Sequence, residues 1–196
     1  MATQEIEIRY KLSNRVAFEE LLRTMGVQPE GRVRVVDHWF IPNEITSSEA
    51  QVEWFDSGRG CSIRVREKYK GESVVHVSLG TKRVTDPLGH KALSEAEVGI
   101  ESFDKAQSLL VMMDRKEFLT IDKTRATYRK DEFEITIDDI QGYGVGVEIE
   151  LKQEEVSAEE GVQSIRAFAK TFGLTEADEY EKSITVSAMQ ALAHYE

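Results

Sequence analysis

The sequence of 196 residues predicts an α+β fold in which an antiparallel β-sheet is flanked by helices. Eight strand-like segments follow one another along the chain, most of them joined by short connections, and a few segments have helical periodicity. Hydrophobic residues make up 40% and charged residues 31% of the chain, which is typical of a globular protein with a substantial core. No repeat, linker or low-complexity tract divides the chain, so we expect one domain over residues 1–196.

The strand-like segments share an alternation of apolar and polar residues and are bounded by turn signals. They cover residues 4–12, 32–40, 59–69, 73–82, 92–100, 117–128, 132–139 and 143–153. Three of the connections, YKGES (69–73), RKDEF (129–133) and QGYGVG (141–146), predict hairpin turns. Strands joined in this way run antiparallel.

Apolar residues recur at helical spacing in three segments, residues 14–26, 102–114 and 157–173. We expect Gly26 to be the C-cap of the first and Ser102 to be the N-cap of the second. The third begins with a capping box at Ser157. We expect a fourth helix over 181–194, and we interpret the polar, acidic segment 41–57 as a long loop.

The first strand, EIEIRYKL (5–12), places all of its charged residues on one face, because side chains alternate across a strand. Five further strands repeat this pattern, mostly with one sign of charge on each. The charged positions are Glu5, Glu7, Arg9 and Lys11; Arg64, Arg66 and Lys68; Glu95 and Glu97; Lys123, Arg125 and Arg129; Glu132, Glu134 and Asp138; and Glu148 and Glu150. A solvated outer face of an antiparallel sheet is one interpretation. However, like charges two residues apart on one face repel each other and require a reason.

A closed barrel supplies that reason if its apolar face points outward under helices and its charged face lines the interior. Carboxylates in such an interior would hold Mg²⁺ or Mn²⁺, which prefer oxygen ligands. Arginine and lysine would bind phosphate oxygens, arginine in bidentate fashion. On this interpretation Glu5 and Glu7 belong to a metal, whereas Arg9 and Lys11 belong to a phosphate.

With these charged strands, the chain resembles the CYTH superfamily, the triphosphate tunnel metalloenzymes, and within it the class IV adenylate cyclase-like branch. The family hallmark is Glu-x-Glu-x-Lys on the first strand, and residues 5–9 match it with arginine in place of lysine. Further matching motifs follow in order over nearly the whole chain: VVDHWF (35–40), CSIRVR (61–66), SEAEV (94–98), IDKTRATY (121–128) and FEITIDDIQGYGVGVEIEL (133–151).

The resemblance implies an eight-stranded antiparallel β-barrel, the triphosphate tunnel fold, with flanking helices. It implies Mg²⁺ or Mn²⁺ bound by Glu5, Glu7, Glu148 and Glu150, with Asp138 beside them. It implies phosphate binding by Arg9, Lys11, Arg64, Arg66, Lys82, Lys123 and Arg125, with Arg129 as a further candidate. Glu95, Glu97 and Glu134 would be additional acids of the tunnel.

Some positions depart from the family pattern. Arg9 keeps the positive charge but cannot act as a general base, because a guanidinium does not deprotonate; Lys11 on the same face could supply one. We therefore expect Arg9 and Lys11 to be the catalytic residues. Leu93 stands where a basic residue often precedes the paired acids, and Ile184 replaces a tyrosine near the end of the chain.

Two reactions and one non-catalytic role are compatible with this pattern. We favour hydrolysis of a triphosphate (tripolyphosphate, a nucleoside triphosphate or thiamine triphosphate), because hydrolysis does not require an adenosine placed for in-line attack. A class IV adenylate cyclase would convert ATP to cyclic AMP and pyrophosphate. A binding module would hold a nucleotide or polyphosphate without turnover.

The overall charge and the cysteine content indicate the setting of the protein. A formal net charge of −11 argues against a general nucleic-acid binder. The single cysteine, Cys61, fits a reducing cytoplasm, and no apolar run approaches the length of a membrane span. We therefore expect a cytoplasmic protein with a small triphosphate partner and neither nucleic acid nor membrane as a partner. The sequence leaves the oligomeric state open, a homodimer included.

Overall fold

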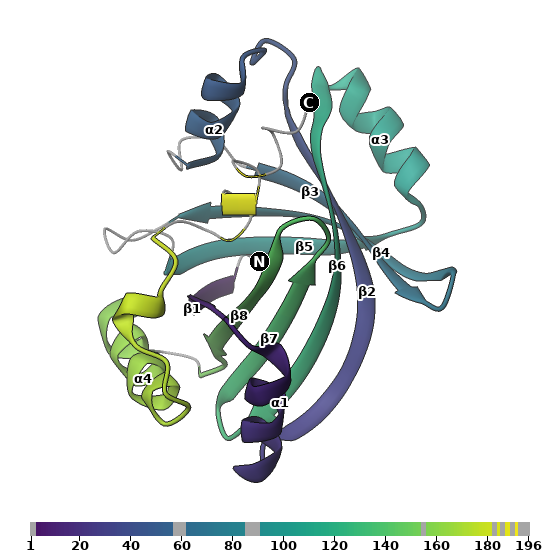
Figure 1. Cartoon of the computed structure of the whole chain (residues 1–196). Helices are drawn as coiled ribbons and strands as arrows, with labels where there is room; N and C mark the ends of the chain where they lie inside the picture. Colours follow the sequence, from purple (N-terminus) through teal and green to yellow (C-terminus); the bar gives the residue numbers. More distant parts are fainter. Residues whose placement is uncertain are drawn as a thin grey trace.

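In a computed structural model, the chain forms a closed barrel of antiparallel strands with the neighbour order β1-β5-β4-β3-β2-β6-β7-β8 (Figure 1). The structure describes residues 3–56, 62–84, 91–153, 156–181, 184, 187–188 and 191. The predicted eight-stranded antiparallel barrel is therefore confirmed. The strands are β1 (Thr3–Lys11), β2 (Gln28–Pro42), β3 (Ser62–Lys70), β4 (Ser73–Val84), β5 (Ala92–Ile100), β6 (Arg115–Lys130), β7 (Phe133–Ile140) and β8 (Gly144–Leu151).

The longest strands, β2 and β6, extend beyond their predicted bounds and pair along almost their whole length. Gln28 pairs with Arg129 at one end and Pro42 pairs with Arg115 at the other. Two register irregularities interrupt this ladder, one of them between Trp39 and Phe40. Bulges of this kind increase local twist and help a sheet to close.

Helices α1 (Arg15–Thr24), α3 (Phe103–Met112) and α4 (Ala158–Lys170) lie where helical periodicity predicts them, and η1 (Glu176–Asp178) is a short 3-10 turn. Ser102 accepts a hydrogen bond from the Lys105 amide, and Ser157 forms the expected capping box with Glu160. Gly26, with a φ of 72°, ends the first helical segment in the left-handed conformation that glycine tolerates best. The part of the expected fourth helix that the structure describes (184, 187–188 and 191) is helical, and its other residues lie outside the described range.

The prediction of a loop over 41–57 was wrong, because α2 (Ser48–Asp56) occupies most of this segment. The Ser47 hydroxyl accepts a hydrogen bond from the Ala50 amide, so the serine acts as an N-cap. Glu49 lies in the first turn, where a negative charge favours the helix dipole. The prediction failed because the polar and acidic composition of this segment was interpreted as a loop, although the segment contains a capped helix.

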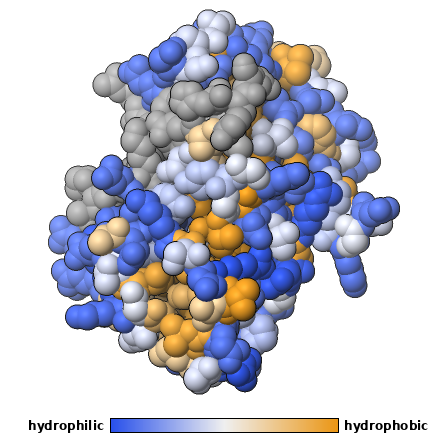
Figure 2. All heavy atoms as spheres, viewed as in Figure 1, coloured by the Kyte–Doolittle hydropathy of each residue, from blue (hydrophilic) through white to orange (hydrophobic). Residues whose placement is uncertain are grey.

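The outer face of the barrel is apolar and is covered by helices, as the charge pattern predicts. Ile6, Ile8 and Ile149 pack with residues of α4 and α1 in one buried cluster, whereas Val65 and Val77 pack with α3 in another. On the face shown in Figure 2, apolar side chains gather between α4 and α1, and most of the remaining surface is hydrophilic. Burial of this outer face leaves the charged residues no place other than the barrel interior.

A separate apolar cluster closes part of the barrel interior at one end. Trp39, Ile121 and Ile140 share strand faces with inward-pointing charged residues, and Ile184 of the C-terminal segment packs against them. A side chain at Gly146 would overlap Ile184, so the glycine permits this close approach. The Tyr180 amide also donates a hydrogen bond to the carbonyl oxygen of Arg9, at 2.9 Å, which ties the C-terminal segment to β1.

Within the described part of the chain, no helix has both the length and the apolar character that crossing a membrane requires.

Candidate functional site

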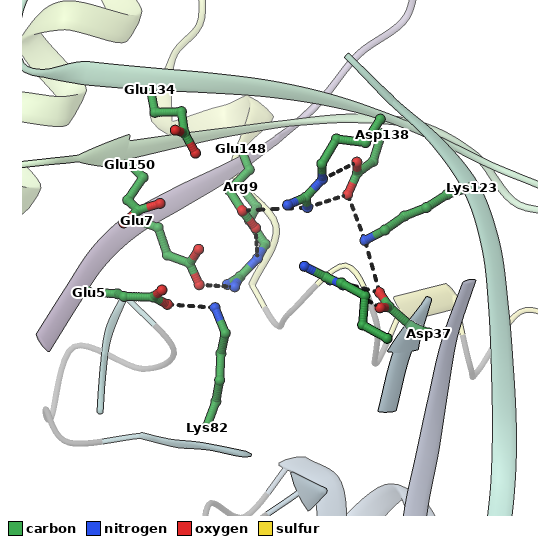
Figure 3. A network of polar contacts seen from close by, with 12 residues as sticks. Glu5, Glu7, Arg9, Asp37, Lys82, Lys123, Glu134, Asp138, Glu148 and Glu150 are labelled. Atoms are coloured by element: carbon green, nitrogen blue, oxygen red, sulfur yellow. Dashed lines mark hydrogen bonds and ion pairs between the residues drawn. The ribbon is translucent and has the colours of Figure 1, made fainter. Parts of the chain in front are cut away.

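The strand register turns the predicted charged residues toward one another inside the barrel. Arg9 lies opposite Glu148 on the β1–β8 pair, and Arg125 lies opposite Asp138 on the β6–β7 pair. Directly opposed residues of antiparallel strands share a face, so these side chains all point inward. The resulting network has a cationic side, built on β3, β2, β6 and β7, and a carboxylate-rich side, built on β1, β5, β7 and β8 (Figure 3).

The cationic side consists of three basic side chains held by two buried aspartates. Arg66 donates to Asp37 through Nε at 2.6 Å and Nη2 at 2.9 Å. Arg125 donates to Asp138 through Nε and Nη2, both at 2.7 Å. The Lys123 ammonium lies between the aspartates, 3.2 Å from Asp37 and 2.9 Å from Asp138. All five residues are buried or half-buried, so water screens these ion pairs little.

Arg64 connects the two sides of the interior. Its Nη2 atom lies 2.8 Å from a carboxylate oxygen of Glu97 and 3.3 Å from one of Glu95. Its guanidinium also lies over the ring of Trp39, 5.6 Å from the ring centroid. The expected substrate-binding residue Arg64 and the expected tunnel acids Glu95 and Glu97 are therefore in mutual contact.

On the carboxylate-rich side, two basic residues lie among the predicted metal ligands. Arg9 contacts Glu7 and also donates from Nε to Glu148 at 2.9 Å. The Lys82 ammonium lies 2.5 Å from a carboxylate oxygen of Glu5. Lys82, whose alignment the sequence left unsettled, is thus an interior residue.

Several carboxylates on this side have raised pKa values. Burial raises the pKa of Glu5 to about 7, although Lys82 opposes the shift. Burial also raises the pKa of Glu150 to about 7, against the opposing charge of Lys152. Glu7 is 1% exposed, and its burial raises its pKa by more than the neighbouring cation lowers it. These raised values mean that negative charge on this side is incompletely neutralised by the protein.

Carboxylates near the cationic side have lowered pKa values instead. Burial alone would raise the pKa of Glu148, but Arg9 and Arg125 hold it far below its ordinary value. For Asp138, burial is likewise outweighed by Arg125, and the pKa falls to about 2. The interior therefore carries an electrostatic gradient from one side to the other.

Two predicted site residues lie apart from this network. Lys11 is exposed at the end of β1, and its ammonium lies 5.8 Å from the centroid of the Tyr180 ring. Arg129 lies opposite Glu134 near the far end of β6, and no ion pair joins it to another residue in the described part of the chain. The remaining predicted residues all take part in the network or line the same face.

Two functional candidates were missing from the predicted set. Asp37 is one charged residue within the apolar run VVDHWF, so no alternation of charges marked it, although the motif around it resembles the family. Lys152 follows the last predicted pair of acids, and its ammonium lies 2.7 Å from Glu150 and 3.6 Å from Glu134. Its position two residues after Glu150 was the available signal, because residues two apart share a strand face.

The donor chemistry of the carboxylate-rich side fits a hard divalent cation. Glu5, Glu7 and Glu150 supply oxygen ligands with excess negative charge, as Mg²⁺ or Mn²⁺ requires. As placed, however, no group of three His, Cys, Asp or Glu side chains among the described residues converges closely enough to hold a metal. Arg9 and Lys82 contact these carboxylates instead: Arg9 contacts Glu7 and Glu148, and the Lys82 ammonium lies near Glu5 and Glu95.

A closed antiparallel barrel with an interior divided between cations and carboxylates defines a class of proteins with a charged barrel interior. A CYTH domain model matches residues 3–184, and the chain belongs to the CYTH domain family. A Methanocaldococcus jannaschii protein whose name proposes adenylate cyclase activity is 24% identical over 160 residues, covering 81% of this chain and 82% of that protein.

Solved structures show the same fold. A Pyrococcus horikoshii protein, PH1819, matches with a TM-score of 0.76 and 23% identity, covering 95% of this chain and 98% of its own. A Hippeastrum protein named for adenylyl cyclase, and described as having a dominant triphosphatase activity, matches with a TM-score of 0.63 and 18% identity, covering 95% of both chains. At such identities the likeness concerns the fold alone.

Proposed function

We propose that the protein is a metal-dependent phosphohydrolase that cleaves a triphosphate bound inside the barrel. The observation that carries this proposal is the divided interior. Arg66, Lys123 and Arg125 are held by Asp37 and Asp138. Figure 3 shows Asp37, Lys123 and Asp138 on one side of the interior and Glu5 and Glu150 on the other. A triphosphate has several negative charges along a short chain and would bind the cationic side. The carboxylates opposite would weaken this binding without preventing it, and a metal between them and the phosphates would offset the repulsion and support cleavage.

The residues of the chain would have separate roles in this reaction. Glu5, Glu7, Glu148 and Glu150 would hold Mg²⁺ or Mn²⁺, which neutralises phosphate charge and lowers the pKa of bound water. Arg66 and Arg125 would bind phosphate oxygens and stabilise the charge that develops on them in the transition state. The low exposure of these side chains would strengthen each contact by excluding water.

Hydrolysis is favoured over cyclisation by the apolar cluster at one end of the interior. Cyclisation requires the 3′-hydroxyl of ATP to be held in line with the α-phosphorus, which calls for an adenosine site near the phosphates. Trp39, which lies under the Arg64 guanidinium, is buried in the apolar cluster with Ile121 and so is not an open platform for a base. The dominant triphosphatase activity described for the Hippeastrum protein agrees with this choice.

An adenylate cyclase is the second candidate, because the Methanocaldococcus jannaschii relative is named for that activity. One product analysis distinguishes the candidates. The protein is incubated with tripolyphosphate and, separately, with ATP, each in Mg²⁺, in Mn²⁺ and in EDTA. We expect metal-dependent release of inorganic phosphate. Cyclic AMP with pyrophosphate would instead establish a cyclase, and binding without any product would favour a binding module.

A further inference from the structure

The two interior aspartates differ from the interior glutamates in what they contact. Asp37 is 2% exposed and Asp138 is 4% exposed, and each accepts two hydrogen bonds from one arginine. Lys123 joins them, so the five side chains form a continuous chain in the order Arg66, Asp37, Lys123, Asp138, Arg125 (Figure 3). Shared basic residues also join the glutamates, such as Lys82 between Glu5 and Glu95, but the contacts differ: each aspartate binds the Nε and Nη2 atoms of one arginine, whereas Glu5 and Glu150 each contact a lysine.

We propose that Asp37 and Asp138 are positioning residues that fix Arg66 and Arg125 for phosphate binding, and that neither aspartate is a metal ligand. This inference rests on the proposed function and assigns Asp138 differently from the family resemblance, which places it beside the metal. Asp37 acts through Arg66, and Asp138 acts through Arg125.

The geometry of the arginines supports this assignment. Both guanidinium groups use the same edge, Nε and Nη2, to contact their aspartates. The Nη1 atoms take no part in the hydrogen bonds found among the described residues. A guanidinium has five N–H donors in a fixed plane, so an aspartate that binds one edge orients the opposite edge. The opposite edge is thereby available for an anion.

The hydrogen bonds of Asp138 leave little room for a metal. Its two oxygens accept from Arg125 Nε, Arg125 Nη2 and Lys123 Nζ, all within 2.9 Å. A cation at this carboxylate would be repelled by both basic groups, whereas Glu5 and Glu150 each face a single lysine across an excess of acid. The lowered pKa of Asp138 and the raised pKa values of Glu5 and Glu150 agree with this contrast. The pKa of Glu148 is also lowered, but its contacts are looser than those of Asp138: Arg9 donates to its Oε2 atom at 2.9 Å, whereas Arg125 lies 3.7 Å from its Oε1 atom.

The strand positions place each arginine directly beside its aspartate. Asp37 lies directly opposite Arg66 on the β2–β3 pair, and Arg125 lies directly opposite Asp138 on the β6–β7 pair. The central pair, β2–β6, carries Lys123. Four neighbouring strands therefore carry three basic side chains joined through two aspartates, an arrangement that offers several positive charges to an anion with several negative ones. Thr136 lies on β7 two residues before Asp138, and its buried hydroxyl has no hydrogen-bond partner among the described residues.

The test separates anion binding from metal binding. Tripolyphosphate affinity is measured by calorimetry in EDTA, and Mn²⁺ affinity is measured by electron paramagnetic resonance without anion. For Asp37→Asn and for Asp138→Asn we expect the tripolyphosphate Kd to rise by about tenfold or more, with the Mn²⁺ Kd unchanged within about twofold. Glu5→Gln, on the carboxylate-rich side, is the matched control and should weaken Mn²⁺ binding instead.

A double-mutant cycle tests whether Asp37 acts through Arg66. Arg66→Lys keeps the charge but lacks the second edge, so it should lose as much tripolyphosphate affinity as Asp37→Asn. The double variant should be no weaker than either single variant. If Asp37→Asn does not fold, Asp37→Glu displaces the carboxylate while keeping its charge and should show the same selective loss.

The outcomes distinguish this inference from the proposed function. Wild-type protein that binds tripolyphosphate together with aspartate variants that bind it equally well would overturn the positioning role alone. Loss of Mn²⁺ binding in Asp138→Asn with tripolyphosphate binding intact would make Asp138 a metal ligand and would also overturn it. Failure of the wild-type protein to bind tripolyphosphate at all would contradict the proposed function itself.

Discussion

The role of each interior residue depends on how completely its charge is compensated. Asp138 faces Arg125 and Lys123, and its pKa lies at about 2. Glu150 faces only Lys152 and other acids, and burial raises its pKa to about 7. The two carboxylates are only a few strand positions apart on neighbouring strands, so sequence spacing does not distinguish them. Their partners do: Asp138 faces two basic residues of the preceding strand β6, whereas Glu150 faces Lys152, two residues further along the chain.

Glu148 should be essential for metal-dependent turnover. We expect Glu148→Gln to lower the rate by about 100-fold, because the amide keeps the shape of the side chain but loses a charged oxygen ligand. The variant should remain folded, since Arg9 keeps its contact with Glu7. Phosphate release at saturating Mg²⁺ measures the effect. Glu72→Gln, at an exposed turn, is the control and should be fully active. Wild-type activity in Glu148→Gln would remove Glu148 from the metal site.

At the scale of elements, single residues hold the C-terminal segment against the barrel. Glu179 is 9% exposed and accepts hydrogen bonds from Arg166 of α4 while its carboxylate lies 2.8 Å from the Lys91 ammonium. Ile184 packs into the end of the interior beside Gly146. These contacts bring α4, β1, β8 and the C-terminal segment together at one end of the barrel.

Removal of the charge at Glu179 should destabilise the protein. Glu179→Gln leaves Lys91 and Arg166 without a shared carboxylate, and we expect a loss of about 1–3 kcal/mol in the free energy of unfolding. Glu176→Gln is the matched control, because Glu176 also contacts Arg166 but is 71% exposed, and it should cost less than about 1 kcal/mol. Urea unfolding of both variants measures the difference. Equal losses of unfolding free energy in the two variants would mean that the burial of Glu179 does not strengthen its ion pairs.

The close approach of Gly146 and Ile184 predicts a specific rescue. Gly146→Ala should cost about 1–3 kcal/mol, because the new methyl group overlaps Ile184. Ile184→Ala should cost about 2–4 kcal/mol through the cavity that it leaves. In the double variant the new methyl group at position 146 occupies space that the truncated side chain at position 184 has left. The double variant should therefore lose less unfolding free energy than the sum of the two single losses. Additive losses in thermal unfolding would show that the residues do not contact each other.

For the whole molecule, strand alternation predicted most of the barrel and most of its interior. Residues 5–12 indicate which face is charged, and the apolar face must then lie outward under helices. Alternation could not predict the pairing of charges across the interior. That pairing depends on the neighbour order β1-β5-β4, in which Lys82 of β4 reaches past β5 to Glu5 of β1. Alternation also missed Asp37, a lone charge in an apolar run, and α2, a helix built largely from polar residues.

The two sides of the interior should give the metal-free protein opposite responses to pH. Glu5 and Glu150 have folded-state pKa values of about 7, raised from 4.5, so the folded state binds more protons than the unfolded state between these values. Acidification in this window therefore stabilises the fold. The pKa of Asp37 is shifted in the opposite direction: burial would raise it, but Arg66 and Lys123 hold it well below 3.8. The ionised Asp37 therefore stabilises the fold at neutral pH, and this stabilisation is lost when the pH falls below 3.8.

We therefore expect the melting temperature in EDTA to rise as the pH falls from about 8 to about 5, and then to fall steeply below about pH 4. The rise arises from protonation of Glu5, which faces Lys82 and Glu95, and of Glu150, which faces Lys152 and Glu134. Saturating Mg²⁺ should abolish the rise, because a bound cation favours the ionised carboxylates and competes with protons. The double variant Glu5→Gln/Glu150→Gln should show a clearly smaller rise over the same window, since its amides do not titrate and only Glu7 keeps a raised pKa among the three carboxylates. A melting temperature that increases from pH 5 to pH 8 in EDTA would contradict the excess of buried negative charge on this side, and with it the reason for placing the metal there.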